Sequence, residues 1–158
     1  MQWNCASIFQ HGNEFNKYLS SLQHTPEIIC LQETKLKTEK NFSINGYIVI
    51  RKDRNLNKGE KASGGVAILV KETLQYKNME LKFDNSMIEC LGITLIIKNS
   101  KVNIINVYDP PTNKFNGNIY KKFFQCQGNT IITGDFNAHN CLWKSNQTDK
   151  EVNVLKLY

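Results

Sequence analysis

The stretch NTIITGDFNAHN, residues 129–140, joins a short apolar run to a cluster of polar side chains. Asn129–Thr133 is typical of a buried strand, and Gly134–Asn140 is expected to be a loop. In layered α/β proteins, ligand-binding and catalytic groups gather where strands end and loops open to solvent. Asp135 and Asn137 stand at such a place. Taken alone, each is better explained by the preference of Asp and Asn for turns.

Three further apolar runs end in polar side chains in the same way. Asn4 follows Trp3 near the start of the chain, Glu33 follows the run IICLQ, and Tyr108 follows the run VNIINV. A tyrosine at the end of a strand usually packs with its hydroxyl in water. The repetition of the pattern nevertheless makes these side chains, with Asp135, one candidate constellation.

The remainder of the chain alternates short apolar runs with polar segments, which predicts roughly seven strands and two full helices. The order of these elements favours an α/β fold with a mixed sheet or a two-sheet sandwich and helices outside, in a single domain over residues 1–158. The predicted strands are Gln2–Ser7, Ile28–Leu31, Gly46–Ile50, Val66–Val70, Met87–Ile97, Lys101–Tyr108 and Asn129–Thr133, and the predicted helices are His11–Gln23, Asn118–Cys126 and the start of a last one at Glu151–Tyr158.

Composition excludes several classes of protein. The 158 residues carry a formal net charge of +6, and 41% of them are hydrophobic, which fits one globular domain with a core. No apolar run approaches the length of a membrane span, and no secretion signal is recognisable. Five scattered cysteines favour reduced thiols in an intracellular protein over disulfides or a zinc site. The basic charge is compatible with a phosphate-rich partner but is not evidence for one.

Three fragments, in this order along the chain, carry a family resemblance. They are LQET at Leu31–Thr34, NVYDPP at Asn106–Pro111 and GDFNAH at Gly134–His139, with Trp3-Asn4 before them and GGVAIL at Gly64–Leu69 between. Together they resemble the endonuclease/exonuclease/phosphatase superfamily, which includes abasic-site endonucleases, deoxyribonuclease I and inositol-phosphate phosphatases. GDFNAHN followed by Leu142-Trp143, together with GGVAILV, is most similar to the endonuclease domain of non-LTR (LINE-type, jockey-like) retrotransposon polyproteins.

This resemblance covers nearly the whole chain and implies both a fold and an activity. The implied fold is a four-layer sandwich of two mixed β-sheets flanked by helices. The implied activity is Mg²⁺-dependent cleavage of one DNA strand, which exposes a 3′-hydroxyl that primes reverse transcription. It also implies DNA as partner, fusion to a reverse transcriptase domain in the parent element, and an intracellular location, nuclear when the protein acts on DNA.

The resemblance implies a role for each member of the constellation. Glu33 would bind Mg²⁺, with Mn²⁺ as a substitute, because carboxylate oxygens suit hard cations. Asn4 would orient Glu33 through a hydrogen bond. Asp135 would position the attacking water or take its proton. Asn137 would donate a hydrogen bond to the phosphate or the nucleophile, and Tyr108 would donate its hydroxyl to the phosphate.

Two further groups are candidates for substrate contact. His139 follows Asn137 closely and is interpreted as a loop-packing or DNA-contacting residue. Arg54 belongs to a basic loop that is expected to contact DNA phosphates, although a solvated charged loop explains it equally well. The basic residues of this loop are Arg51, Lys52, Arg54, Lys58 and Lys61. Trp143 is expected to anchor the last helix by packing.

The sequence departs from the family pattern after the GDFN box. The family has a later Asp or Ser-Asp motif and a final Asp-His pair whose histidine contacts the scissile phosphate, and the chain ends at Tyr158 before either. The expectation is therefore a domain that is incomplete at its C-terminus and a weakened nuclease. Two alternatives remain open: a catalytically inactive nucleic-acid-binding remnant, and a phosphatase of the same superfamily.

Overall fold

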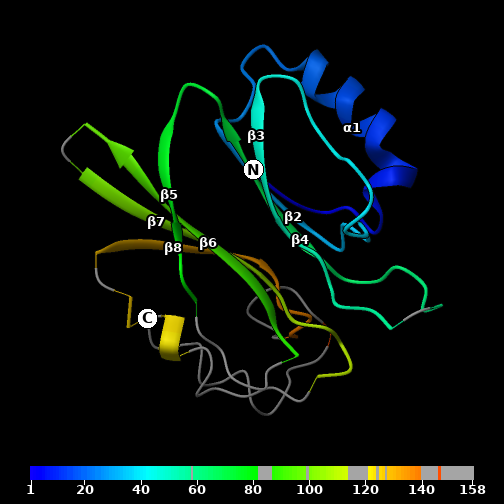
Figure 1. Ribbon diagram of the computed structural model, residues 1–158. Coiled ribbons are helices and arrows are strands. Elements are labelled where there is room, and N and C mark those ends of the chain that lie inside the picture. Colours follow the sequence, from blue (N-terminus) through cyan, green and yellow to red (C-terminus); the bar gives the residue numbers. More distant parts are fainter. Residues whose placement is uncertain are drawn as a thin grey trace.

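The part of the chain that the structure, a computed structural model, describes contains the helix α1, eight β-strands and a short helical stretch at residues 121–123 (Figure 1). The described residues are 1–57, 59–81, 87–98, 100–113, 121–123, 125–126, 128–139 and 146. The elements are β1 (Gln2–Asn4), α1 (Ile8–Ser21), β2 (Ile28–Gln32), β3 (Tyr47–Lys52), β4 (Val66–Lys71), β5 (Gln75–Met79), β6 (Glu89–Ile97), β7 (Ser100–Tyr108) and β8 (Asn129–Asp135).

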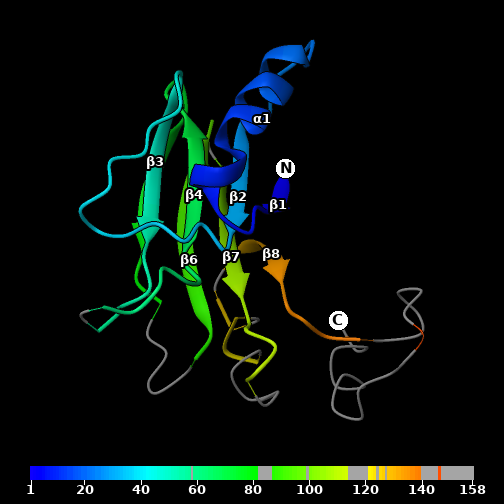
Figure 2. The ribbon, with the colours of Figure 1, turned by 90° about the vertical axis from the view of Figure 1, so that its right-hand side faces the viewer.

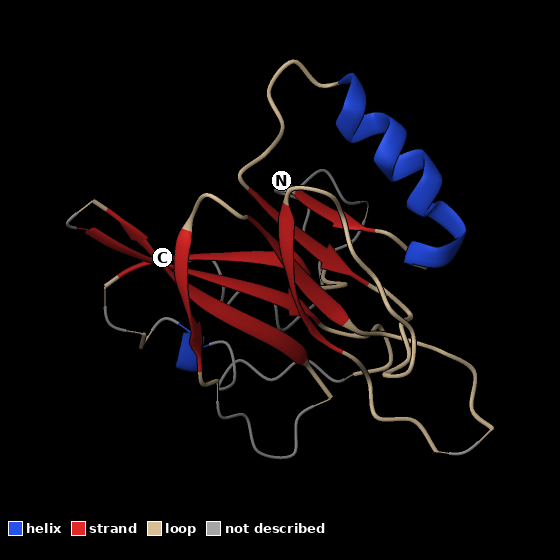
Figure 3. Ribbon diagram, turned by 45° about the horizontal axis from the view of Figure 1, so that its top comes forward, coloured by secondary structure: helices blue, strands red, loops and turns tan. Residues whose placement is uncertain are grey.

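The strands form two four-stranded sheets, with the orders β1-β2-β4-β3 and β5-β6-β7-β8. Both sheets are mixed, because β1 runs parallel to β2 and β7 runs parallel to β8, while the other neighbours are antiparallel. The two sheets lie face to face, and α1 covers the outer face of the first one (Figures 1 and 3). The predicted α/β sandwich of two mixed sheets is confirmed.

Three apolar clusters fill the spaces between these layers. Phe15 of α1 belongs to a cluster on the outer face of the first sheet. Ile68 of β4 and Ile93 of β6 belong to the cluster between the two sheets. Val107 of β7 packs with Phe123 on the outer face of the second sheet. Side chains alternate between the two faces of a strand, so β7 contributes both to the core between the sheets and to the outer cluster.

The structure corrects several predicted boundaries and adds one strand. The helix begins at Ile8 rather than His11, because Ile8 is buried in the same cluster as Phe15. The edge strand β5 was not predicted, because its sequence QYKNM has no apolar run and its strand conformation depends on pairing with β6. Strand β8 extends to Asp135, which the sequence had assigned to the following loop.

Some predictions fall wholly or partly outside the described residues. Of the predicted helix Asn118–Cys126, residues 121–123 are helical, and four other members are not described. The helix at Glu151–Tyr158, Trp143 and Lys58 also lie outside the described residues. Within the described part of the chain, no helix is long and apolar enough to span a membrane.

The described cysteines are free thiols, in agreement with the sequence. Cys5, Cys30 and Cys90 are buried, and burial raises the pKa of each thiol to about 11. These three thiols therefore stay protonated and unreactive near neutral pH. Cys126 is partly exposed.

Candidate active site

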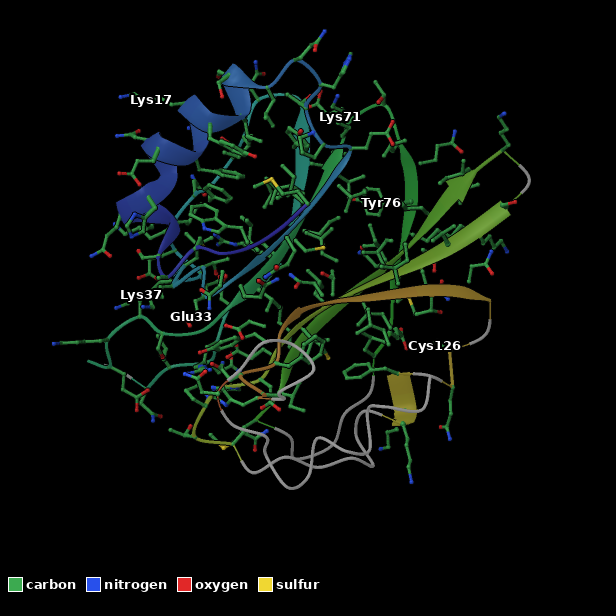
Figure 4. All side chains as sticks on the ribbon, turned by 180° about the vertical axis from the view of Figure 1, so that it is seen from behind. Lys17, Glu33, Lys37, Lys71, Tyr76 and Cys126 are labelled. Atoms are coloured by element: carbon green, nitrogen blue, oxygen red, sulfur yellow. The ribbon has the colours of Figure 1, made fainter. Side chains whose placement is uncertain are left out.

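The candidate residues come together where strands of both sheets end. In the first sheet, Asn4 pairs with Gln32, the residue before Glu33. In the second sheet, Tyr108 pairs with Asp135. Each of these strand pairs is parallel, so its two carboxyl ends meet at one edge of its sheet. Figure 2 shows β7 and β8 ending side by side, and Figure 4 shows Glu33 at the opposite end of the first sheet from Lys71.

Asn4 connects the two sheets through its side-chain amide. Its Nδ2 donates to Glu33 Oε1 at 2.9 Å and to Asp135 Oδ2 at 2.7 Å. Its Oδ1 accepts a hydrogen bond from the Ala6 backbone N–H at 3.1 Å, which fixes which end of the amide faces the carboxylates. The predicted contact between Asn4 and Glu33 is present, and the contact with Asp135 is an addition to it.

The backbone at Glu33 is in the left-handed region, with φ of 51°. This conformation is unfavourable for a residue with a Cβ and is often found at functional sites. Hydrogen bonds on its C-terminal side hold the segment in place: Thr34 N–H donates to Gly65 O at 3.1 Å, and Lys35 N–H donates to Gly64 O at 2.8 Å. The segment after β2 is thereby tied to the residues that precede β4.

Two glycines of the family-like motifs permit close backbone approach. Gly65 has φ of 86°, and a Cβ there would lie 2.5 Å from Thr34 Oγ1. Gly134 has φ of 152°, and a Cβ there would overlap the backbone of Val107 on β7. The glycines in GGVAIL and GDFN therefore let β4 and β8 approach the segments that carry Glu33 and Tyr108.

The carboxyl of Glu33 favours its ionised form. Burial acts to raise its pKa, but the hydrogen bond from Asn4, the charge and hydrogen bond of Lys35, and the Tyr108 hydroxyl together outweigh burial. As a result, the pKa of Glu33 lies below its ordinary value. Lys35 Nζ is 3.5 Å from Glu33 Oε2, so a cation already lies beside this oxygen.

Tyr108 remains a protonated hydrogen-bond donor at physiological pH. Burial and the charge and hydrogen bond of Glu33 raise its pKa to about 12. Arg54 opposes this shift, and its guanidinium carbon lies 6.0 Å from the centroid of the Tyr108 ring, within the range of a cation–π contact. Arg54 is held there by an ion pair with Glu89, the residue opposite Tyr108 in the β6–β7 register.

Asn137 stands two residues after Asp135, in the loop that leaves β8. Its backbone N–H donates to Asp135 Oδ1 at 3.0 Å, and its Nδ2 donates to Asp109 O at 2.8 Å. Its φ is 44°, a conformation that Asn tolerates better than most residues. The Asn137 amide nitrogen carries a second N–H, which is the group that would reach a substrate.

The remaining predicted residues differ in how closely they approach the candidate site. Arg54 borders the site through Tyr108, and His139 is exposed on the loop after Asn137. Arg51 donates to the backbone oxygens of Thr38 and Lys40, so its contacts secure a loop.

Sequence reasoning missed Lys35 and Glu89. The spacing of Lys35, two residues after the predicted metal ligand, was the available indication for it. The sequence offered no indication for Glu89, because its role depends on its pairing with Tyr108 across neighbouring strands.

The donor set fits a magnesium ion with few protein ligands. Among the described residues, no group of three or more His, Cys, Asp and Glu side chains forms a metal cluster. Mg²⁺ is commonly bound through one or two carboxylates while it keeps several waters. The Glu33 carboxylate, with its lowered pKa, is a suitable ligand, and Asp135 lies close through their shared partner Asn4.

Two mixed sheets pack as a sandwich, and carboxylates, an amide and a protonated phenol meet at their strand ends. Comparison with known families places this arrangement in one family. The chain belongs to the endonuclease/exonuclease/phosphatase family, whose model matches residues 1–154.

The chain is also similar to a protein of a mobile element. The chain is 22% identical over 142 residues to the RNA-directed DNA polymerase from the mobile element jockey of Drosophila melanogaster. The match covers 89% of this chain and 15% of that much longer protein.

Solved structures show the same fold. The endonuclease domain of TRAS1, a telomere-specific non-LTR retrotransposon, matches with a TM-score of 0.72 and 16% identity over 98% of this chain and 67% of that one. The 3′–5′ exonuclease NExo from Neisseria meningitidis matches with a TM-score of 0.59 and 22% identity, over 87% of this chain and 57% of that one. The resemblance to retrotransposon endonucleases within this superfamily is confirmed.

Proposed function

We propose that this protein is a Mg²⁺-dependent DNA endonuclease of retrotransposon origin that nicks one strand by hydrolysing a phosphodiester. The observation that carries the proposal is the Asn4 amide, which brings the Glu33 and Asp135 carboxylates of two sheets to one point. Tyr108, held protonated beside them, adds a donor for a phosphate oxygen. Carboxylates for a cation and a water, next to hydrogen-bond donors for a phosphate, meet the needs of this reaction.

In this proposal each side chain has one task. Glu33 holds the ion, and Mg²⁺ supplies stabilisation of the negative charge that builds up on the phosphate. Asp135 accepts a proton from the attacking water or orients it. Tyr108 and the second N–H of Asn137 donate hydrogen bonds to phosphate oxygens. The water oxygen forms a bond to phosphorus while the bond from phosphorus to the 3′ oxygen breaks. The departing 3′ oxygen takes a proton from solvent water, so one DNA end carries a 3′-hydroxyl and the other a 5′-phosphate.

DNA as the substrate is supported by chemistry and by similarity. The chain carries a net charge of +6, and Arg54 borders the site beside Tyr108. The TRAS1 structure is the endonuclease domain of a retrotransposon, and the jockey relative is an RNA-directed DNA polymerase. We extend the proposal to a parent element in which the domain is fused to a reverse transcriptase, and to action in the nucleus.

A second candidate function is DNA binding without cleavage. It is favoured by the Lys35 ammonium, which lies 3.5 Å from Glu33 Oε2 and already neutralises the carboxylate on which a metal would depend. In that case the basic residues would hold the DNA backbone, and the carboxylates would be retained for their hydrogen bonds with Asn4.

The proposal is tested with three assays on one purified protein. Supercoiled plasmid is incubated with the chain in Mg²⁺ and in EDTA, phosphate release from inositol phosphates is followed in parallel, and DNA retention is measured by gel shift. Nicking that needs Mg²⁺ supports the endonuclease. DNA retention without nicking supports the second candidate, and release of phosphate from inositol phosphates without nicking supports a phosphatase.

A further inference from the structure

A pair of buried amides crosses the core between the two sheets. Gln32, the last residue of β2, and Asn106 of β7 are both fully buried. Gln32 Nε2 donates to Asn106 Oδ1 at 2.6 Å. Asn106 Nδ2 donates to Leu31 O and to Ala67 O, each at 2.9 Å. The second sheet is therefore hydrogen-bonded to both β2 and β4 of the first sheet.

The other end of the Gln32 amide also has a partner. Gln2 Nε2 on β1 donates to Gln32 Oε1 at 2.5 Å. Both polar atoms of each buried amide are thus hydrogen-bonded, which makes their burial tolerable. The described cluster that packs between the sheets is hydrophobic, with Ile68 and Ile93 as examples. Apolar contacts fill space without fixing direction, whereas a satisfied polar network specifies one arrangement.

The position of this pair in the strands relates it to the site. Gln32 directly precedes Glu33. Asn106 stands two residues before Tyr108 and pairs with Thr133, which stands two residues before Asp135. Because side chains alternate along a strand, Asn106 and Tyr108 point to the same face of β7, the face toward the first sheet. On both sheets, the amide pair therefore precedes the residues that carry the proposed chemistry by one or two positions along the strand.

We propose that Gln32 and Asn106 are positioning residues that set the distance between the Glu33 carboxylate on one sheet and Tyr108 and Asp135 on the other. This inference rests on the proposed function of the site. Asn4 connects the two sheets at the strand ends, where it bonds both carboxylates. The Gln32–Asn106 hydrogen bond connects them again inside the core. Without the pair the sheets keep their apolar packing, but their mutual offset is less strictly defined.

The test uses the double variant Gln32→Met/Asn106→Leu, which keeps side-chain size and removes both amides together. Replacing both partners by apolar groups avoids leaving one of the two amides unsatisfied. Asn103→Leu is the matched control. Asn103 is a buried asparagine on the same strand, but its amide bonds Thr94 and Thr130 within the second sheet. Nicking kinetics and unfolding in urea are measured for all three proteins.

The expected result is a kcat for nicking at least tenfold lower in the double variant, with KM within twofold of the parent. Asn103→Leu should keep the kcat of the parent, even if its unfolding midpoint falls. A merely structural role would lower stability in both variants alike and leave kcat of the folded protein unchanged. Unchanged kcat in the folded double variant would overturn the proposal.

A second readout does not depend on activity. The Asn4 side-chain N–H₂ signals in a ¹⁵N spectrum report whether this amide still donates hydrogen bonds to the Glu33 and Asp135 carboxylates. Their hydrogen exchange should be at least tenfold faster in the double variant and unchanged in Asn103→Leu. If the parent fails to nick DNA, the proposed function fails, yet slow exchange in the parent and fast exchange in the variant would still establish the positioning role.

Gln32→Met alone provides the answer if the double variant does not fold. It removes the donor between the two amides while Asn106 keeps its bonds to Leu31 O and Ala67 O. The expected result is an exchange rate of the Asn4 amide between those of the parent and a fully released amide. An exchange rate equal to that of the parent would overturn the positioning role.

Discussion

Asn4 Nδ2 lies 2.7 Å from Asp135 Oδ2, although the two residues are 131 positions apart in the chain. The same nitrogen lies 2.9 Å from Glu33 Oε1. One amide from the first strand therefore unites a carboxylate that follows β2 with a carboxylate that ends β8. The proposed activity depends on this junction, because it places the proposed cation ligand, Glu33, and the proposed water-activating group, Asp135, side by side.

Asn4→Ala removes the donor that both carboxylates share. We expect nicking to fall roughly 10- to 100-fold, the usual cost of losing a residue that orients a metal ligand. The measurement is kcat for nicking of supercoiled plasmid at saturating Mg²⁺. Asn45→Ala, at an exposed position in a loop, is the control. A kcat for Asn4→Ala equal to that of the control would show that the amide does not organise the site.

Lys35→Met is expected to raise the pKa of Glu33. Burial already acts to raise this pKa, and Lys35 is among the groups that lower it. A lowered carboxyl pKa means that the ionised form, which would bind the metal, persists as the pH falls. Loss of the Lys35 charge therefore moves the acid limb of the nicking profile to higher pH. Lys40→Met removes the same charge from an exposed residue and should leave the limb in place. Equal profiles for the two variants would contradict the expectation.

Tyr108→Phe deletes the phenol that we assign to the phosphate. Removing one donor of this kind costs on the order of 10²- to 10³-fold in kcat. Because burial and Glu33 raise the pKa of Tyr108 to about 12, the hydroxyl stays protonated throughout the range of an ordinary assay. The nicking profile of the parent should therefore show no alkaline decline attributable to Tyr108 below about pH 11. Tyr18→Phe, on the exposed side of α1, is the control, and a similarly small effect of both changes would remove Tyr108 from the mechanism.

Arg54→Ala is expected to weaken DNA binding and to reduce its dependence on salt. A residue that contacts a phosphate contributes about one unit to the slope of log K against log salt concentration. Fluorescence anisotropy of labelled duplex DNA at several salt concentrations measures this slope. Lys61→Ala, in the same loop but exposed, should change the slope less. If both variants keep the slope of the parent, the basic loop is a solvated surface.

The sequence predicted the strands that are marked by a run of apolar, β-branched residues within the strand itself. Val66–Val70 was predicted as a central strand because it is apolar and β-branched, and β4 is Val66–Lys71. The prediction for β2 differs from the structure by one residue. The strand-end positions of Asn4, Glu33, Tyr108 and Asp135 followed from the same patterns, and their family-like motifs supplied their proposed roles.

Features that depend on tertiary contacts were not predictable in this way. Strand β5 exists because β6 offers it a partner, and its own residues are mostly polar. The contact between Asn4 and Asp135 requires the offset between two sheets, which no local pattern encodes. The left-handed backbone of Glu33 is likewise unfavourable for its residue type, and contacts with Gly64 and Gly65 stabilise it.

The proposal that Glu33 binds Mg²⁺ for DNA nicking is tested most directly by comparing the parent with Glu33→Gln in Mg²⁺-dependent nicking of supercoiled plasmid. This change keeps the size of the side chain and removes the charge that would hold the ion, and Glu39→Gln, on an exposed loop, is the matched control. We expect the parent and Glu39→Gln to nick the plasmid in Mg²⁺ and not in EDTA, and we expect at least 100-fold less nicking by Glu33→Gln. Undiminished nicking by Glu33→Gln, or a folded parent that does not nick in Mg²⁺, would contradict it.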